Sequence, residues 1–306
     1  MKKFFYILIF IFSFFCIQIH AQDEIIKVYN PEEVLVEINE NPNEIEGLSW
    51  NRWTSKNFVV CSLNDLQAQY LHKHLELVKT WIYNRWGLED IEFSAPCKLI
   101  CVDNKDLFKK LFNIEETKVE LRHDSNGRIN ESVIFLLIDG PPSKTVPVPL
   151  SKVCYSEFSQ VHDLSFSPWS EIGMSELNGT IDQIKYKILN LKNYLNEKQP
   201  IYYSESLLNL NKDQYKELDL DKKNLFSSSS VLFCLFLRKE FGQSVYLDFV
   251  KESSKSSPDV ALKNILKFSD YLHLDKTFKR YMIDLSNDVT DDITPNSYLQ
   301  VNEVRY

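Results

Sequence analysis

Glycine is scarce in this sequence, with seven residues in 306. Phosphate-binding loops and the nucleophile elbow of serine hydrolases need glycines close together, because their backbone adopts left-handed angles or approaches a ligand closely. The seven glycines are spread from Gly47 to Gly242 and form no such motif. The sequence therefore argues against a glycine-rich phosphate site, a serine-hydrolase elbow and a turn-dense β-sandwich.

A surplus of basic residues is also lacking. Lys and Arg number 35 against 43 Asp and Glu, which gives a formal net charge of −8. Nucleic-acid-binding domains gather Lys and Arg on one face to neutralise phosphates. We therefore expect no nucleic-acid partner.

Long apolar runs are absent after the first residues. Two lysines precede an apolar run over residues 4–15, and Ala21 gives a cleavage site before Gln22. This pattern predicts a signal peptide over residues 1–21. An uncleaved anchor is the alternative, although the run is shorter than the roughly 20 residues that a spanning helix needs. We expect an exported, periplasmic or extracellular protein with no stable membrane span after cleavage.

Closely spaced cysteine pairs of the C-x-x-C type are absent. Beyond the expected signal peptide there are five cysteines, all but one in apolar runs: Cys61, Cys97, Cys101, Cys154 and Cys234. Buried free thiols are the favoured interpretation. One or two disulfides remain open in an exported protein, for example between Cys61 and the strand that carries Cys97 and Cys101. Those last two cannot pair with each other in one strand, where four residues span about 13 Å.

The hydrophobic pattern that is present predicts an α+β protein. Strands are expected first and helices dominate from residue 151 onward. Expected strands cover 34–38, 57–61, 98–102, 119–123 and 132–138. Expected helices cover 64–86, 106–112, 151–162, 168–178, 180–197, 204–210, 225–241, 243–252, 257–268 and 274–286. This order divides the chain into an N-terminal segment at 22–50, an α+β half at 51–165, a helical half at 166–288 and a tail at 289–306.

The most informative segment, residues 153–179, reads VCYSEFSQVHDLSFSPWSEIGMSELNG. A zinc-peptidase helix carries His-Glu-x-x-His, with two imidazole ligands one turn apart and a glutamate as base. Here the frame reads Ser156-Glu157-Phe158-Ser159-Gln160, so the base position is kept and both imidazoles are lost. Downstream, Pro168-Trp169 leads into Gly173-Met174-Ser175-Glu176.

This segment resembles the active-site region of the gluzincins, the peptidase MA-like zinc metallopeptidases. The resemblance places Ile172 where the third zinc ligand stands, and Glu176 where a carboxylate supports a histidine ligand. It also matches a later helix in which Phe226 stands where tyrosine is usual. Over residues 50–285 it implies a thermolysin-like core, a small mixed sheet with long helices, followed by a helical subdomain.

Zinc chemistry needs three protein ligands and an open water position. On this register the chain has none of the three ligands, so we expect no metal and no cofactor. Glu157 becomes a remnant base without a metal-bound water to act on. Ser156 and Gln160, one turn apart, can hydrogen-bond each other in the space of the two imidazoles.

These observations lead us to expect a secreted, metallopeptidase-like protein that binds a peptide or an envelope protein, or acts as a scaffold, without catalysis. Gluzincin-like enzymes hold an extended peptide along an edge strand, and the candidates here are the strands at 119–123 and 132–138. The alternative is an active hydrolase with a noncanonical site around Glu157. A metal site rebuilt from Glu157, His162, Glu171 and Glu176 is disfavoured. His162 lies five residues beyond Glu157 and points well away from it, and Glu171 is one residue, or about 100°, off the expected ligand position.

Two further alternatives remain open. A glycosidase would pair Glu157 with Glu171 or Glu176 as its two carboxylates, but no sugar-binding aromatic platform is evident. The second alternative is a purely structural relic domain, and the sequence does not distinguish such a domain from a binding protein.

Overall fold

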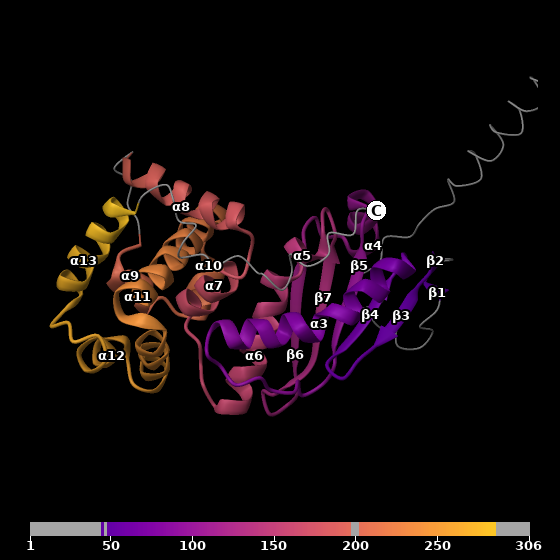
Figure 1. Ribbon diagram of the computed structural model, residues 1–306, viewed down its shortest axis with the longest axis horizontal. Helices are drawn as coiled ribbons and strands as arrows, with labels where there is room; N and C mark the ends of the chain where they lie inside the picture. The colour runs from indigo at the N-terminus through magenta and orange to yellow at the C-terminus, as the bar shows by residue number, and fades with distance from the viewer. Residues whose placement is uncertain (1–43, 46–47, 197–201, 286–306) are drawn as a thin grey trace, which may run out of the picture.

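The computed structural model describes residues 44–45, 48–196 and 202–285. The expected signal peptide at 1–21, the strand at 34–38 and the tail at 289–306 lie outside these residues. Within the described part, the chain forms a sheet-containing half and a helical half that lie side by side (Figure 1).

A five-stranded mixed sheet organises the first half. Its order is β3-β4-β5-β7-β6, with the three central strands parallel and the two outer strands antiparallel to their neighbours. The strands are β3 (Asn51–Thr54), β4 (Phe58–Ser62), β5 (Cys97–Val102), β6 (Lys118–His123) and β7 (Ile129–Leu137). A separate two-stranded hairpin, β1 (Glu44–Ile45) and β2 (Leu48–Ser49), precedes them.

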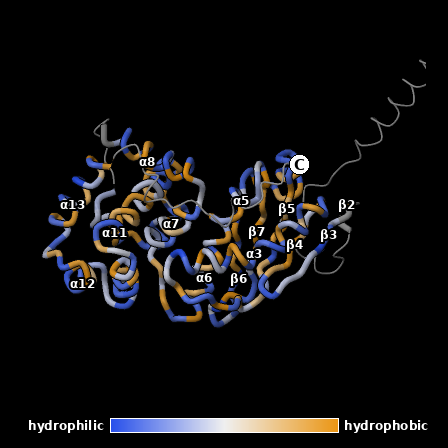
Figure 2. Tube along the Cα trace, in the orientation of Figure 1, coloured by the Kyte–Doolittle hydropathy of each residue, from blue (hydrophilic) through white to orange (hydrophobic). Residues whose placement is uncertain are grey.

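The central strands are apolar on both faces, as parallel strands covered by helices usually are, and they stand out as hydrophobic in Figure 2. On one face, Val60, Leu99 and Ile134 join a core shared with helices α3 (Asp65–Arg85) and α6 (Pro147–His162). On the other face, a smaller core packs against α4 (Lys105–Phe112).

All five cysteines of the described region are buried free thiols. Cys61 belongs to the core beneath α4, whereas Cys97 and Cys101 belong to the core on the opposite face of the sheet. A disulfide needs Cβ atoms about 3.8 Å apart, so Cys61 cannot pair with either cysteine of β5. The disulfide suggested by the sequence is therefore wrong.

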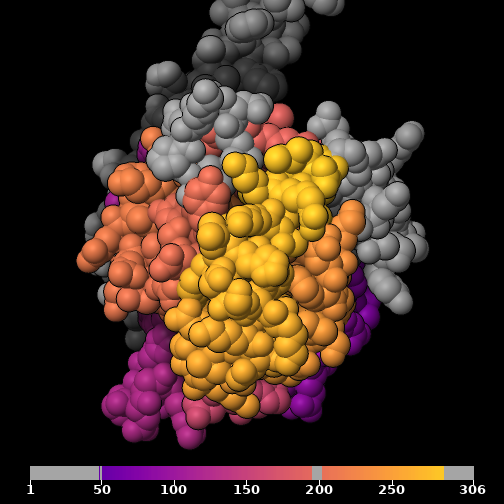
Figure 3. Space-filling view, turned by 90° about the vertical axis from the view of Figure 1, so that its left-hand side faces the viewer, coloured from indigo at the N-terminus to yellow at the C-terminus, as the bar shows by residue number. Residues whose placement is uncertain are grey.

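The second half is built from helices around α11. The helices are α7 (Pro168–Glu176), α8 (Ile181–Asn196), α9 (Ser204–Asn209), α10 (Lys212–Glu217), α11 (Leu220–Lys255), α12 (Pro258–Asn264) and α13 (Tyr271–Asp284). Gly242 interrupts α11 with φ 81° and ψ 163°, so the helix stops there and resumes at Gln243. Helices α12 and α13 form the end of the molecule that faces the viewer in Figure 3.

The expected α+β class is confirmed by this sheet and these helices. The hairpin around Asn126-Gly127 joins β6 and β7, and the break at residue 242 separates the two expected helices. The proline-rich segment at Gly140–Pro149, which its composition predicts to be a loop, instead contains α5 (Pro142–Thr145) and the first turn of α6. Prolines fit a first helical turn because its N–H groups have no partner within the helix. Among the described residues, no helix is both long and apolar enough to cross a bilayer.

Candidate functional site

Helix α6, which carries the glutamate frame, lies against β6, β7 and α3. Its inward face is apolar and includes Leu150, Val153 and Phe158. The Tyr83 hydroxyl of α3 donates a hydrogen bond to the Cys154 carbonyl, with an O···O distance of 2.9 Å. Asp163 ends the helix with a left-handed φ of 47°. The helix thus packs on β6 and β7 beside α3, which packs on β3 and β4.

Glu157 is directed into the protein. Its exposed fraction is 0%. Its Oε2 accepts two hydrogen bonds from Ser94, from the backbone N at 3.1 Å and from Oγ at 2.5 Å. Its Oε1 is buried and has no hydrogen-bond partner among the described residues. Burial raises the pKa of Glu157 above its ordinary value, and the bonds from Ser94 oppose that shift.

Gln160, one turn further along, binds the same serine. Its Nε2 donates to Ser94 Oγ at 2.8 Å, and its Oε1 accepts a short hydrogen bond from the backbone N of Ile129, at the start of β7. The Ser156 side chain is half-buried and makes no hydrogen bond within the described part of the chain. The bond expected between Ser156 and Gln160 is therefore not formed, because the amide is already satisfied by Ser94 and Ile129.

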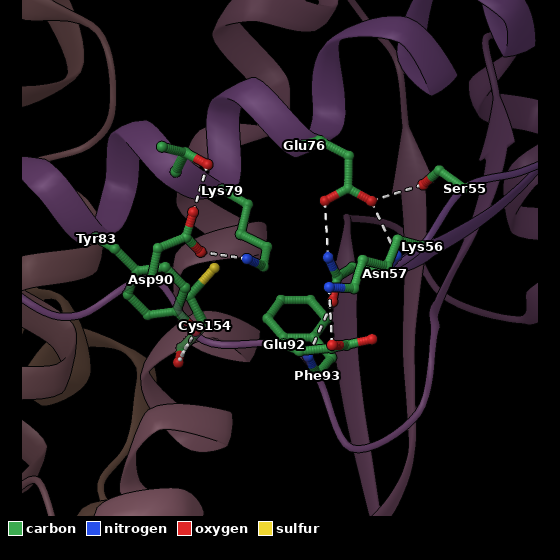
Figure 4. Close-up of polar contacts among 11 residues, drawn as sticks. Ser55, Lys56, Asn57, Glu76, Lys79, Tyr83, Asp90, Glu92, Phe93 and Cys154 are labelled. Carbon is green, nitrogen blue, oxygen red and sulfur yellow. Dashed lines mark hydrogen bonds and ion pairs between the residues drawn. The ribbon is translucent and has the colours of Figure 1, made fainter.

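Ser94 lies on the loop between α3 and β5, and Figure 4 shows how that loop is fixed. Glu76 on α3 accepts hydrogen bonds from the backbone and side-chain nitrogens of Asn57, at 2.9 and 2.8 Å. The Asn57 Oδ1 in turn accepts a bond from the backbone N of Phe93 at 2.9 Å. The residue directly before Ser94 is thereby tied to α3 through Asn57.

A second attachment holds the start of the same loop. Lys79, buried on α3, forms an ion pair with Asp90, whose other oxygen accepts a 2.5 Å bond from Thr80 Oγ1. The Lys79 ammonium also lies 5.3 and 5.5 Å from the ring centres of Tyr83 and Phe93, at a distance that allows cation–π attraction. Figure 4 shows both attachments, at Asp90 and at Phe93. Together they fix the loop that presents Ser94 to Glu157.

The second half of the motif lies on α7. Ile172 is partly buried and packs against the main core. Glu171 forms an ion pair with Lys212 at 3.1 Å, and Glu176 lines a cleft between the two halves. Gly173 lies where α7 crosses α11: a Cβ there would come within 2.4 Å of Cys234 Sγ. The glycine permits the close approach of the two helices.

The cleft has a volume of about 750 Å³ and receives residues from both halves. The residues that line it include Thr117, Leu137, Val148, Glu176, Asp182 and Tyr186. Thr117 directly precedes β6, so the cleft opens at the N-terminal end of that strand. Of the two strands proposed as a peptide-binding edge, β6 is the outer one, whereas β7 lies between β5 and β6.

The residues of the motif do not fit a zinc ion. Ser156, Gln160 and Ile172 supply neither imidazole nor carboxylate, and the Gln160 side chain is engaged by Ser94 and Ile129. Within the described ranges, no three His, Cys, Asp or Glu side chains are grouped so that they could hold a metal ion. What the site offers chemically is one buried carboxyl group with a raised pKa.

The sequence located Glu157 and Gln160 but missed Ser94, which joins them. The contact spans 63 residues, and nothing in the local sequence around Ser94 marks it.

No protein-family model matches the chain, and no curated protein is significantly similar to it. Its function must therefore be argued from its own geometry.

Proposed function

We propose that this chain is an exported, gluzincin-like protein that binds an extended peptide or a partner protein of the cell envelope without cleaving it. The observation that carries this proposal is the state of Glu157. Its carboxyl group is fully buried and hydrogen-bonded to Ser94 instead of facing water. A general base must reach the proton that it removes, and this carboxyl group faces a protein loop.

The binding surface that we propose is the free edge of β6. Within the described part of the sheet, β6 pairs with β7 on one side only. Its Val119 and Leu121 are partly buried and pack against the main core, so this face of the strand is held by the protein. A peptide added to the edge would form main-chain hydrogen bonds, and one end of it would enter the cleft at Thr117.

Hydrogen–deuterium exchange tests this proposal. A peptide selected from a random-peptide display library against the mature protein is synthesised and added back. We expect slower exchange of backbone amides in β6, because those that face the free edge gain acceptors. The opposite edge strand, β3, serves as the internal control and should be unchanged. Protection at β3, or binding without protection at β6, would refute strand addition at this edge.

A second candidate is a hydrolase that uses Glu157 as a general acid or base. It is favoured by one observation: Glu157 Oε1 is buried without a partner among the described residues, and perturbed carboxyl groups are frequent at active sites. A peptide-library digest with the wild type and Glu157→Gln at equal concentration separates the two candidates. Cleavage that disappears in the variant would establish the hydrolase and overturn the binding proposal.

A further inference from the structure

Two arginines lie where the end of α3 meets α11, near enough for their charges to repel each other. Arg85, in the last turn of α3, has its Cζ 5.2 Å from the ring centre of Trp81. Arg238, on α11, has its Cζ 4.8 Å from the ring centre of Trp86. Trp86 is fully buried, and its Nε1 donates to Asn178 Oδ1 at 3.3 Å. Both arginines are half-buried, and none of their guanidinium nitrogens is fully buried without a partner, so solvent reaches these groups.

Within residues 44–45, 48–196 and 202–285, the side chains of Arg85 and Arg238 form no ion pair and no hydrogen bond; their partners are tryptophan rings. Burial lowers the pKa of Arg85 to about 10, and the positive charge of the neighbouring Arg238 is the second cause of this shift. The C-terminus of α3 attracts a cation and accounts in part for Arg85, but Arg238 lies in the interior of α11. Two like charges without a counterion are unfavourable in a half-buried site.

A further donor lies at the same corner. The kink at Gly242 makes Gln243 the first residue of the resumed helix. The Gln243 Nε2 is adjacent to Gly87, where an added Cβ would come within 3.1 Å of it. Gly87 directly follows Trp86, and the ring centre of Tyr246, in the first turn of the resumed helix, lies 5.5 Å from that of Trp86, beside which the Arg238 guanidinium lies. The N-terminal turn of a helix presents backbone N–H groups and partial positive charge.

We propose that Arg85 and Arg238 form a binding site for an oxyanion, a carboxylate or a phosphate group. A guanidinium whose N–H groups have no partner can bind two oxygens of such a group through its planar fork of donors. An oxyanion between the two arginines would cancel their repulsion. This proposal does not depend on the peptide-binding function.

Calorimetric titration of the full mature protein with sodium phosphate, and separately with sodium acetate, at constant ionic strength tests the site. We expect saturable binding of at least one of the two anions. Arg85→Gln and Arg238→Gln should each weaken it by about tenfold or more, as expected for a lost charge-assisted hydrogen bond. Tighter phosphate binding would identify a phosphoryl ligand, and tighter acetate binding a carboxylate ligand.

Arg280→Gln, which removes the same charge from an exposed position on α13, is the matched control and should bind as the wild type does. Arg238→Lys keeps the positive charge but lacks the planar fork of N–H donors, so it too should bind the anion more weakly. It replaces Arg238→Gln in the test if that variant does not fold. The proposal is overturned if the wild type binds neither anion saturably, or if binding is unchanged in the Arg85 and Arg238 variants.

Discussion

Ser94 is the residue on which the candidate site depends. Its hydroxyl donates to Glu157 and accepts from Gln160, so one small side chain joins the loop before β5 to α6. We predict that Ser94→Ala lowers the free energy of unfolding by about 1–3 kcal/mol, because the buried Glu157 carboxyl group loses one of its two hydrogen bonds. Urea denaturation measures this. Ser125→Ala, at an exposed turn, should change stability by less than about 0.5 kcal/mol; equal effects of the two changes would contradict the role of Ser94.

Glu157 should make stability depend on pH. Its pKa is raised above the ordinary value of 4.5 in the folded protein, so the folded state holds the proton more tightly than the unfolded state. The resulting stabilisation is complete below pH 4.5 and is lost as the pH rises through the raised pKa. We predict that Glu157→Gln gains stability relative to the wild type at pH 7 and that the gain disappears at pH 4. Denaturation at both pH values checks this; a difference that is independent of pH would contradict it.

At the residue scale, the sequence frame predicted which residues stand on the helix but not what they contact. The frame places Glu157 and Gln160 one turn apart in any helix. Their partners come from residues 94 and 129, which are distant in the chain and are brought near only by the sheet. Local spacing therefore predicted a hydrogen bond between Ser156 and Gln160, whereas in the fold the Gln160 amide binds Ser94 and Ile129 instead.

At the element scale, the crossing of α7 and α11 joins the motif to the helical half. A Cβ at Gly173 would come within 2.4 Å of Cys234 Sγ and 2.7 Å of the Ser230 carbonyl oxygen. The second contact is with backbone, which cannot rotate away as a side chain can. The glycine therefore sets how closely the two helices approach.

We predict that Gly173→Ala destabilises the protein by about 1–3 kcal/mol through overpacking. Adding Cys234→Ala should recover part of this loss, since it removes one of the two clashing atoms. Thermal unfolding measures both. Gly140→Ala is the control, because a Cβ at Gly140 meets nothing within 4 Å. A Gly173→Ala protein as stable as the control would show that the helices are not held this closely.

Elements with a strong hydrophobic period were predicted with small errors at their ends, whereas short elements without one were missed. The strand β3 reads Asn-Arg-Trp-Thr and exists because it pairs with β4, not because of its own pattern. The helix α10 has no buried residue, but Asn211 and Gln214 form a capping box that a search for helix starts could have found.

At the scale of the whole molecule, the motif is shared between the two halves. Helix α6 belongs to the sheet half and α7 to the helical half, and α7 also packs on α11. The order of strands and helices was predictable from hydrophobic pattern, because each element is local. The cleft was not, because Thr117 and Asp182 reach it from segments whose approach depends on how the halves pack.

Restoring the zinc ligands tests that arrangement. We predict that the triple variant Ser156→His, Gln160→His and Ile172→Glu takes up one zinc ion per chain, if α6 and α7 keep the gluzincin relationship. Replacing Gln160 breaks its bonds to Ser94 and Ile129, so the metal-free variant should be less stable than the wild type. Zinc should restore stability because binding is coupled to folding.

The double variant without Ile172→Glu retains Glu171 as a carboxylate one residue away and should bind zinc much more weakly. Calorimetry with folded protein measures uptake. Equal affinity of the two variants would assign the third ligand to Glu171 and shift the register by one residue, and no uptake by either would show that α6 and α7 do not meet as they do in the zinc enzymes.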